Sequence, residues 1–178
     1  VNQAALDLAG IDLNTKIAGG SIEIENGKLI GILVDNPMGL VDTVMPKPSK
    51  LDMVTALKDA ERIAVSYGLT TVNDAGLNRD VIETIDSLQQ NGDLKIRVYA
   101  MVSNSKENLD YFLAQGVIET ARLRVGSVKV YADGALGSRG ATLREAYSDR
   151  PGHFGAMVTP VEEIEALAKR LAATDYQM

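Results

Sequence analysis

Residues 128–140 read VKVYADGALGSRG and carry the strongest structural signal of the chain. Apolar and polar side chains alternate over the first six positions, which predicts a short β-strand with two unlike faces. A loop with three glycines then follows. A strand that ends in polar residues and a glycine-rich loop is typical of the active-site end of a parallel α/β sheet. The predicted polar face carries Lys129, Tyr131 and Asp133.

Helical and strand patterns alternate along the chain from Ser49 onward. The first of these helices opens with a capping-box pattern at Ser49–Asp52, and glycines end most of them. Repeated β–α units predict a parallel sheet, either a (β/α)8 barrel or a doubly wound sheet. Besides the strand at Lys129, the predicted strands are 69–72 and 94–102, and the predicted helices are 49–67, 80–90, 105–115 and 161–170.

The first 48 residues show a different sequence pattern. A helix is predicted over 2–9, and Asn26-Gly27 predicts a tight hairpin between strands 21–25 and 28–34. Three prolines make residues 36–49 a connector. We therefore expect two parts, 1–48 with the hairpin and 49–178 with the β–α units.

Composition excludes several classes of function. The 178 residues are enough for one well-buried domain, and the net charge of −6 gives no electrostatic footprint for nucleic acid or an anionic membrane. No apolar run is long enough to span a bilayer and no targeting segment is visible, so a cytoplasmic location is expected. The chain has no cysteine and a single histidine, so it cannot alone supply the imidazoles of a typical zinc site. That histidine, His153, lies in a Pro/Gly loop and is expected at the surface.

Three candidate residues each have a functional and a purely structural interpretation. Lys129 could be a carbamylated metal ligand, or a strand-end lysine that reaches solvent or pairs with Asp133. Arg139, with the glycine amides of the loop, could bind a carboxylate or phosphate, although a glycine-rich turn after a strand is common. Asn73, at the end of strand 69–72, could face the mouth of a barrel or lie beside a capping turn.

Two stretches together resemble a known family. They are residues 68–76 (GLTTVNDAG) and 128–141 (VKVYADGALGSRGA), with further similarity at Tyr147-Ser148-Asp149 and in the first 33 residues. The chain resembles the amidohydrolase superfamily, in particular the amidohydrolase-3 or YtcJ-like metal-dependent hydrolases. The resemblance extends over nearly the whole sequence. Histidine is frequent in that family where Asn73 stands here.

The resemblance implies an α/β fold, namely part of a (β/α)8 TIM-type barrel, about strands 2–4 with their helices, preceded by a small β-hairpin segment. It also implies one or two divalent metal ions, with zinc expected, and a carbamylated Lys129 as a ligand. The histidine ligands and the water-activating aspartate are expected outside these residues. Predicted substrate contacts are Asn73, Tyr131, Asp133, Ser138 and Arg139.

The expected reaction is hydrolysis of a non-peptide C–N bond in a small amide or cyclic amide. Two alternatives stay open, namely hydrolysis of another ester-like bond and a non-catalytic ligand-binding or scaffold role. Nucleic acid and membrane partners are not expected, and a homo-oligomer stays open.

Overall fold

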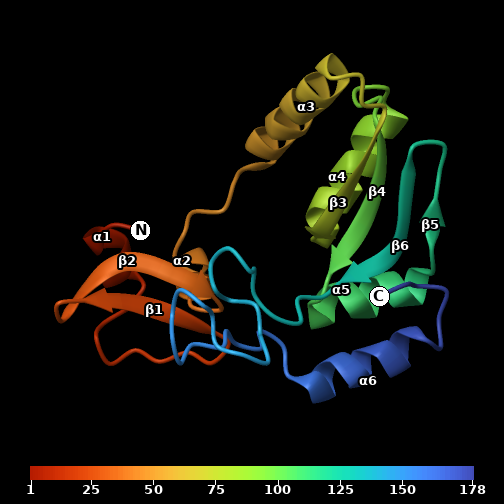
Figure 1. Cartoon of the computed structure of the whole chain (residues 1–178). Coiled ribbons are helices and arrows are strands. Elements are labelled where there is room, and N and C mark those ends of the chain that lie inside the picture. The colour runs from red at the N-terminus through yellow and green to blue at the C-terminus, as the bar shows by residue number, and fades with distance from the viewer. The chain divides into compact units, whose positions relative to one another are not determined.

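The computed structural model describes residues 1–178 and shows a mixed α/β fold (Figure 1). It divides into two compact units, each described by itself. The hairpin unit comprises Val1–Pro46 and Tyr131–Ile164, and the sheet unit comprises Lys47–Val130 and Glu165–Met178. The elements are α1 (Gln3–Leu8), β1 (Gly20–Glu25), β2 (Lys28–Asp35), α2 (Met38–Asp42), α3 (Lys50–Ser66), β3 (Thr71–Leu77), α4 (Arg79–Gln90), β4 (Arg97–Ser103), α5 (Lys106–Gln115), β5 (Ile118–Glu119), β6 (Leu123–Lys129) and α6 (Val161–Leu171).

The predicted hairpin is present in the hairpin unit. Asn26 and Gly27 both have positive φ values, 50° and 73°, as the tight turn between two antiparallel strands requires. Leu6, Ile11 and Val41 form a small apolar core, with β1 and β2 side chains packed against it. Val41 belongs to α2, so the expectation that 36–49 is only a connector is wrong, because Pro37 suits the start of a short helix.

The sheet unit is built on parallel strands. The strand order is β3-β4-β6-β5, where β3, β4 and β6 run parallel and β5 pairs antiparallel with β6. Near the end of the chain, Gln177 forms a parallel bridge with Ser127 of β6. The prediction of a parallel sheet from repeated β–α units is therefore confirmed.

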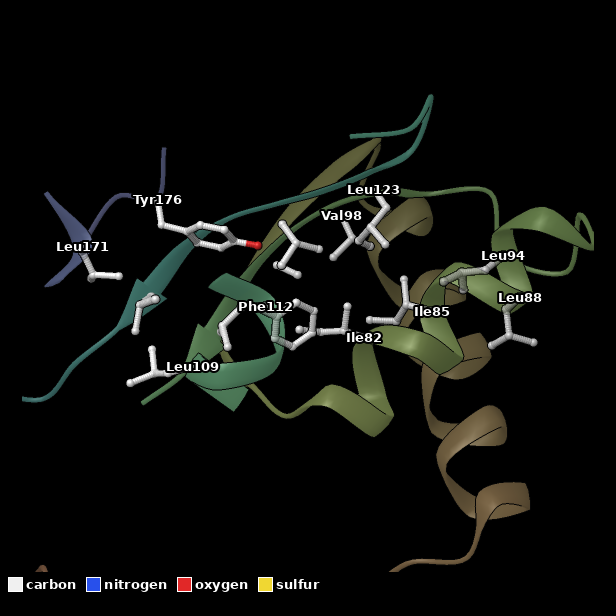
Figure 2. Packing of buried hydrophobic residues seen from close by; sticks show 14 of the residues in the cluster. Ile82, Ile85, Leu88, Leu94, Val98, Leu109, Phe112, Leu123, Leu171 and Tyr176 are labelled. Carbon is white, nitrogen blue, oxygen red and sulfur yellow. The ribbon is translucent and has the colours of Figure 1, made fainter. Parts of the chain in front are cut away.

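One face of this sheet packs against helices and forms the main core (Figure 2). On β4, Val98, Ala100 and Val102 are buried, and they belong to the same cluster as residues of α4 and α5. Phe112 of α5 is 1% exposed within this cluster. Because strand side chains alternate between faces, the residues between these buried positions lie on the opposite face of the sheet.

The strand that contains Lys129 differs from its prediction. It begins at Leu123 and ends at Lys129, so Tyr131 and Asp133 lie beyond it rather than on its polar face. The reason is the length of its neighbour, because Ser103 at the end of β4 is the last residue that pairs with β6, opposite Lys129. Side-chain alternation continues past that point without a partner strand to extend the ladder.

Helix α3 begins as the sequence indicates. The Ser49 side chain accepts a hydrogen bond from the Asp52 amide, and the Asp52 carboxylate accepts one from the Ser49 amide. The predicted division at residue 48 stays a prediction, and in the compact units residues 131–164 group with the hairpin. No helix of the described chain is both long and apolar enough to cross a membrane.

Candidate active site

The face of the sheet opposite the main core, called the helix-free face below, carries the first group of candidate residues. Asn73 of β3 pairs in register with Tyr99 of β4, and Ser103 of β4 pairs with Lys129 of β6. Asn73 is exposed, whereas Tyr99 and Lys129 are half-buried. The structure therefore brings Asn73 and Lys129 onto one face, as the predicted site requires.

Lys129 occupies the C-terminal end of β6 and extends over β3. Its Cγ lies 3.8 Å from the point where a Cβ would stand on Gly76, which shows that the aliphatic stem covers this glycine. Gly76 has a φ of 104°, which a side-chain-bearing residue rarely adopts. The Lys129 Nζ lies 3.4 Å from the Val130 carbonyl oxygen. Gly76 and Lys129, one from each of the two most distinctive stretches of the sequence, thus lie close together within the sheet unit.

A buried hydroxyl lies next to Lys129 along the same strand. Ser127 is 6% exposed, and its Oγ has no hydrogen-bond partner in the described chain. Its neighbours across the sheet are Met101 on β4 and Gln177 on the other edge. The Tyr99 hydroxyl donates to Gln177 Oε1 at 3.3 Å, so polar groups continue along this face toward the last residues.

The second group of candidate residues lies in the glycine-rich loop, which belongs to the hairpin unit. The Gly140 amide donates to the Ala135 carbonyl, and the Arg139 amide donates to the Leu136 carbonyl. This 6→1 and 5→2 pattern is a Schellman motif, in which the fifth residue takes a left-handed backbone. Arg139 holds that position with a φ of 60°, although glycine is the usual occupant.

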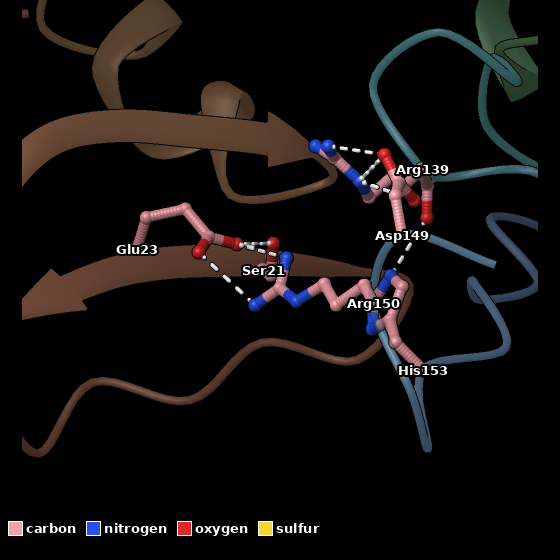
Figure 3. Close-up of polar contacts among 6 residues, drawn as sticks. All are labelled: Ser21, Glu23, Arg139, Asp149, Arg150 and His153. Carbon is pink, nitrogen blue, oxygen red and sulfur yellow. Dashed lines mark hydrogen bonds and ion pairs between the residues drawn. The ribbon is translucent and has the colours of Figure 1, made fainter. Parts of the chain in front are cut away.

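The Arg139 side chain is engaged within the loop (Figure 3). Its Nη2 lies 2.6 Å from Asp149 Oδ2, and its Nε donates to both carboxylate oxygens at 3.1 Å. This two-pronged hydrogen bond lowers the pKa of Asp149 and raises the pKa of Arg139. The Nε2 of His153 lies 2.7 Å from the Arg139 carbonyl oxygen, and its ring lies against Tyr147. These contacts hold both the side chain and the backbone of Arg139.

A second ion pair ties the same loop region to the hairpin (Figure 3). Arg150 donates to both carboxylate oxygens of Glu23 on β1, at 3.1 and 3.2 Å. The Ser21 hydroxyl donates to Glu23 at 2.7 Å. The hydrogen bond from Arg150, followed by that from Ser21, lowers the pKa of Glu23. Glu23 therefore holds its negative charge where Arg150 can reach it.

Two of the remaining predicted residues, Asp133 and Ser138, form hydrogen bonds within the loop. Asp133 Oδ2 accepts a hydrogen bond from the Thr142 amide at 2.8 Å, and the Ser138 hydroxyl donates to the Ala135 carbonyl at 3.0 Å. Tyr131 is 57% exposed. Their roles as substrate contacts stay predictions, as does that of Arg139. All four belong to the hairpin unit, whereas Asn73 and Lys129 belong to the sheet unit.

Sequence reasoning missed two contributors to this region. Asp149 stood in a recognised Tyr-Ser-Asp stretch but was not paired with Arg139, ten residues earlier. His153 was expected at the surface, yet it is half-buried against Tyr147. Opposite charges within one loop were the available signal for the first pair. No sequence pattern indicated the histidine contact.

The described residues do not by themselves form a metal site. No cluster of three or more His, Asp or Glu side chains could hold a metal ion. Lys129 is the one candidate ligand; it is half-buried and lies near Ser127, whose hydroxyl has no hydrogen-bond partner. A complete metal centre would need ligands beyond these residues.

Comparison with known proteins identifies the family. The model of the amidohydrolase family matches residues 1–178. The chain is 31% identical to the protein LONG AFTER FAR-RED 3 of Arabidopsis thaliana, over 92% of this chain and 30% of that protein. It is 29% identical to YtcJ of Bacillus subtilis, which is named as an amidohydrolase, over 96% of this chain and 33% of that protein. The chain thus spans about a third of the length of these relatives.

The chain also matches two solved structures. Two proteins described as uncharacterized metal-dependent hydrolases, from Pyrococcus furiosus and Pyrococcus horikoshii OT3, each match with a TM-score of 0.71 and 25% identity. The matches cover 98% and 97% of this chain, and 36% and 34% of those chains. The parallel sheet and the family match over the full sequence agree, and the chain belongs to the amidohydrolase family.

Proposed function

We propose that these residues are part of a metal-dependent hydrolase that cleaves a non-peptide C–N bond in a small amide or cyclic amide. The observation that carries the proposal is the position of Lys129 at the C-terminal end of a parallel strand, on the helix-free face and over Gly76. In parallel α/β folds, catalytic groups gather at this end of the strands. The names of the Pyrococcus neighbours support a metal-dependent reaction.

The proposed fold of the whole protein is a (β/α)8 barrel. Three parallel strands with helices on one face, and Gln177 beginning a further parallel pairing on β6, are what a segment of such a barrel contains. In a closed barrel the face with Asn73 and Lys129 becomes the interior. The hairpin would then be part of a small appended segment.

Lys129 is the proposed metal ligand of this chain. As a carbamate it presents two anionic oxygens to one or two divalent ions, and we favour zinc. The ion would supply a polarised water for attack on the substrate carbonyl. Lys129 must lose its proton before it can be carbamylated, so burial and metal binding act together. A cytoplasmic location and a homo-oligomeric state stay predictions.

The test uses the full-length protein and measures metal content and hydrolysis separately. Lys129→Ala is expected to lose bound metal and activity together, whereas the exposed Lys95→Ala keeps both. Short carboxylic acids added to Lys129→Ala are expected to restore part of each, because they supply the missing oxygens. Full metal content and full activity in Lys129→Ala would remove Lys129 from the mechanism.

The substrate class is tested with three probes of different chemistry. Acetanilide presents an open amide, hydantoin a cyclic amide and phenyl acetate an ester. Turnover of the first two in preference to the ester supports the proposed C–N specificity, and turnover of the ester alone favours the alternative bond. A protein that binds metal but turns over none of them is better described as a scaffold.

A further inference from the structure

Gly134 and Gly140 lie at the two ends of the glycine-rich loop, and their backbone conformations do not require glycine. Neither has a positive φ, so other residues could adopt their conformations. Space is what excludes a side chain. A Cβ on Gly134 would lie 2.0 Å from Asp35 Oδ2, and a Cβ on Gly140 would lie 2.2 Å from the same oxygen. Both glycines therefore make room for one carboxylate.

Asp35 reaches this place from the last position of β2, within the same hairpin unit. Its backbone is left-handed, with a φ of 59°, which is uncommon for a residue with a side chain. Its Oδ2 is buried and has no hydrogen-bond partner in the described chain. The strained backbone and the unpaired oxygen both cost free energy, so an offsetting contact is expected.

The neighbouring contacts show what the end of β2 does. Asn36 Nδ2 donates to the Ala18 carbonyl at 3.0 Å and to the Val158 carbonyl at 3.1 Å, so the residue after Asp35 ties the hairpin to the segment that follows the loop. At each of the two glycines, the Cα hydrogen that replaces a side chain points toward Asp35 Oδ2, and such C–H groups are weak donors. Asp35 thus stands between the two ends of the loop, where Gly134 also donates its amide to the Gly140 carbonyl.

We propose that Asp35 is a positioning residue for the loop 133–140: its carboxylate fills the space left by Gly134 and Gly140 and fixes the base of the Schellman turn that presents Arg139. The hairpin is then a support for the loop. The contribution of the loop to substrate binding rests on the proposed function. The contact between Asp35 and the two glycines does not.

A double-mutant cycle on the full-length protein tests the contact. Gly134→Ala is expected to lower the urea midpoint, since the three atoms nearest to the new methyl group all belong to the Asp35 carboxylate. Asp35→Gly removes the carboxylate and keeps the left-handed backbone without strain. In the Asp35→Gly background, Gly134→Ala is therefore expected to leave the midpoint unchanged. Equal effects of Gly134→Ala in both backgrounds would overturn the proposal.

Hydrogen exchange tests the positioning itself. The amides of Gly140 and Ala141 both bond to the Ala135 carbonyl, so they report on the turn. In Asp35→Gly their exchange is expected to be at least about tenfold faster, because the turn opens locally. Asp35→Asn keeps the shape and is expected to retain protection, and Asp42→Gly, on the exposed side of α2, serves as the matched control. Two results count against the proposal: unchanged exchange of these amides in Asp35→Gly, or exchange in Asp35→Asn as fast as in Asp35→Gly.

Kinetics separate this inference from the proposed function. With whichever of acetanilide, hydantoin or phenyl acetate is hydrolysed, Asp35→Gly is expected to raise KM several-fold while metal content stays at the parental level. Lost metal in Asp35→Gly would indicate general misfolding and contradict a positioning role. If the parent protein hydrolyses none of the probes, the proposed function fails, and the cycle and the exchange data still decide the role of Asp35.

Discussion

The two units of this chain achieve local order by different physical means. In the sheet unit, the strands are fixed by apolar packing, as the fully buried Val102 and Phe112 illustrate. In the hairpin unit, the long loop is fixed by the Glu23–Arg150 and Arg139–Asp149 pairs. It is also fixed by the close approach of Gly155 to the Ala141 backbone and of Gly134 to the Asp35 carboxylate. Apolar packing does not depend on charge, whereas the exposed Arg139–Asp149 pair is screened by salt. The loop is therefore the more adjustable part.

The largest expected effect is on the core of the sheet unit. Phe112 is 1% exposed and makes an edge-to-face contact with Tyr111 at a centroid distance of 5.1 Å. Phe112→Ala is expected to lower the free energy of unfolding by about 3–5 kcal/mol, because it removes buried area and leaves a cavity. Urea unfolding measures this, and Leu51→Ala, at a residue 74% exposed, is the control. Equal losses in the two variants would contradict the packing account.

The next effect probes backbone crowding in the hairpin unit. Gly155 has a φ of 75°, and a Cβ there would lie 2.0 Å from the Ala141 carbonyl oxygen. Gly155→Ala is expected to cost about 2–4 kcal/mol, from left-handed strain and from the clash together. Gly137→Ala is the matched control, since nothing lies within 4 Å of its would-be Cβ. If Gly155→Ala leaves the free energy of unfolding unchanged, this part of the loop can shift to make room for the methyl group.

A smaller effect concerns the polar tip of a buried aromatic ring. The Tyr176 hydroxyl donates to the Gly116 carbonyl at 2.9 Å, and burial raises its pKa to about 12. Tyr176→Phe is expected to cost about 1 kcal/mol in urea unfolding, the usual contribution of one hydrogen bond. Alkaline absorbance titration is expected to lose one late-titrating tyrosine. Tyr67→Phe, at a residue 80% exposed, leaves stability unchanged in the same assay.

The smallest effect is a pH dependence of the hairpin unit. Arg150 holds the folded-state pKa of Glu23 below its ordinary value of 4.5. The pair therefore contributes fully above pH 4.5, and its contribution is lost as the pH falls through the lower folded pKa. Glu23→Gln is expected to remove less than about 1 kcal/mol at pH 7 and to flatten the stability curve between neutral and acidic pH. An unchanged curve in Glu23→Gln, with Glu25→Gln as control, would show that the pair contributes nothing.

The parts of the fold that sequence reasoning predicted correctly are those with local causes. The Asn26-Gly27 turn and the Ser49 capping box depend on neighbouring residues and were predicted in place. The end of β6 was not, because it depends on where β4 stops pairing, at Ser103, 26 residues before Lys129. The alternation of polar and apolar residues continues past Lys129 and contains no information on a partner strand.

The same difference between local and long-range causes applies to the candidate site. Lys129 and Asn73 were predicted from strand ends and do share one face, since parallel strands align their ends. Pairings across the loop and with the hairpin were missed, as at Asp35 and at the Glu23–Arg150 pair. Residues 127 positions apart in sequence carry no local signal of contact.

The outer edge of β6 is shared between two different neighbours. β5 pairs antiparallel with Arg124 and Val125, and Gln177 pairs parallel with Ser127 just beyond. A strand added on this edge therefore has only the second half of β6 available, and sliding it back would bring it against Ile118 and Glu119. Unprotected strand edges invite mispairing and aggregation. Although β5 has only two residues, it occupies the first half of this β6 edge, and an added strand cannot pair there in a shifted register.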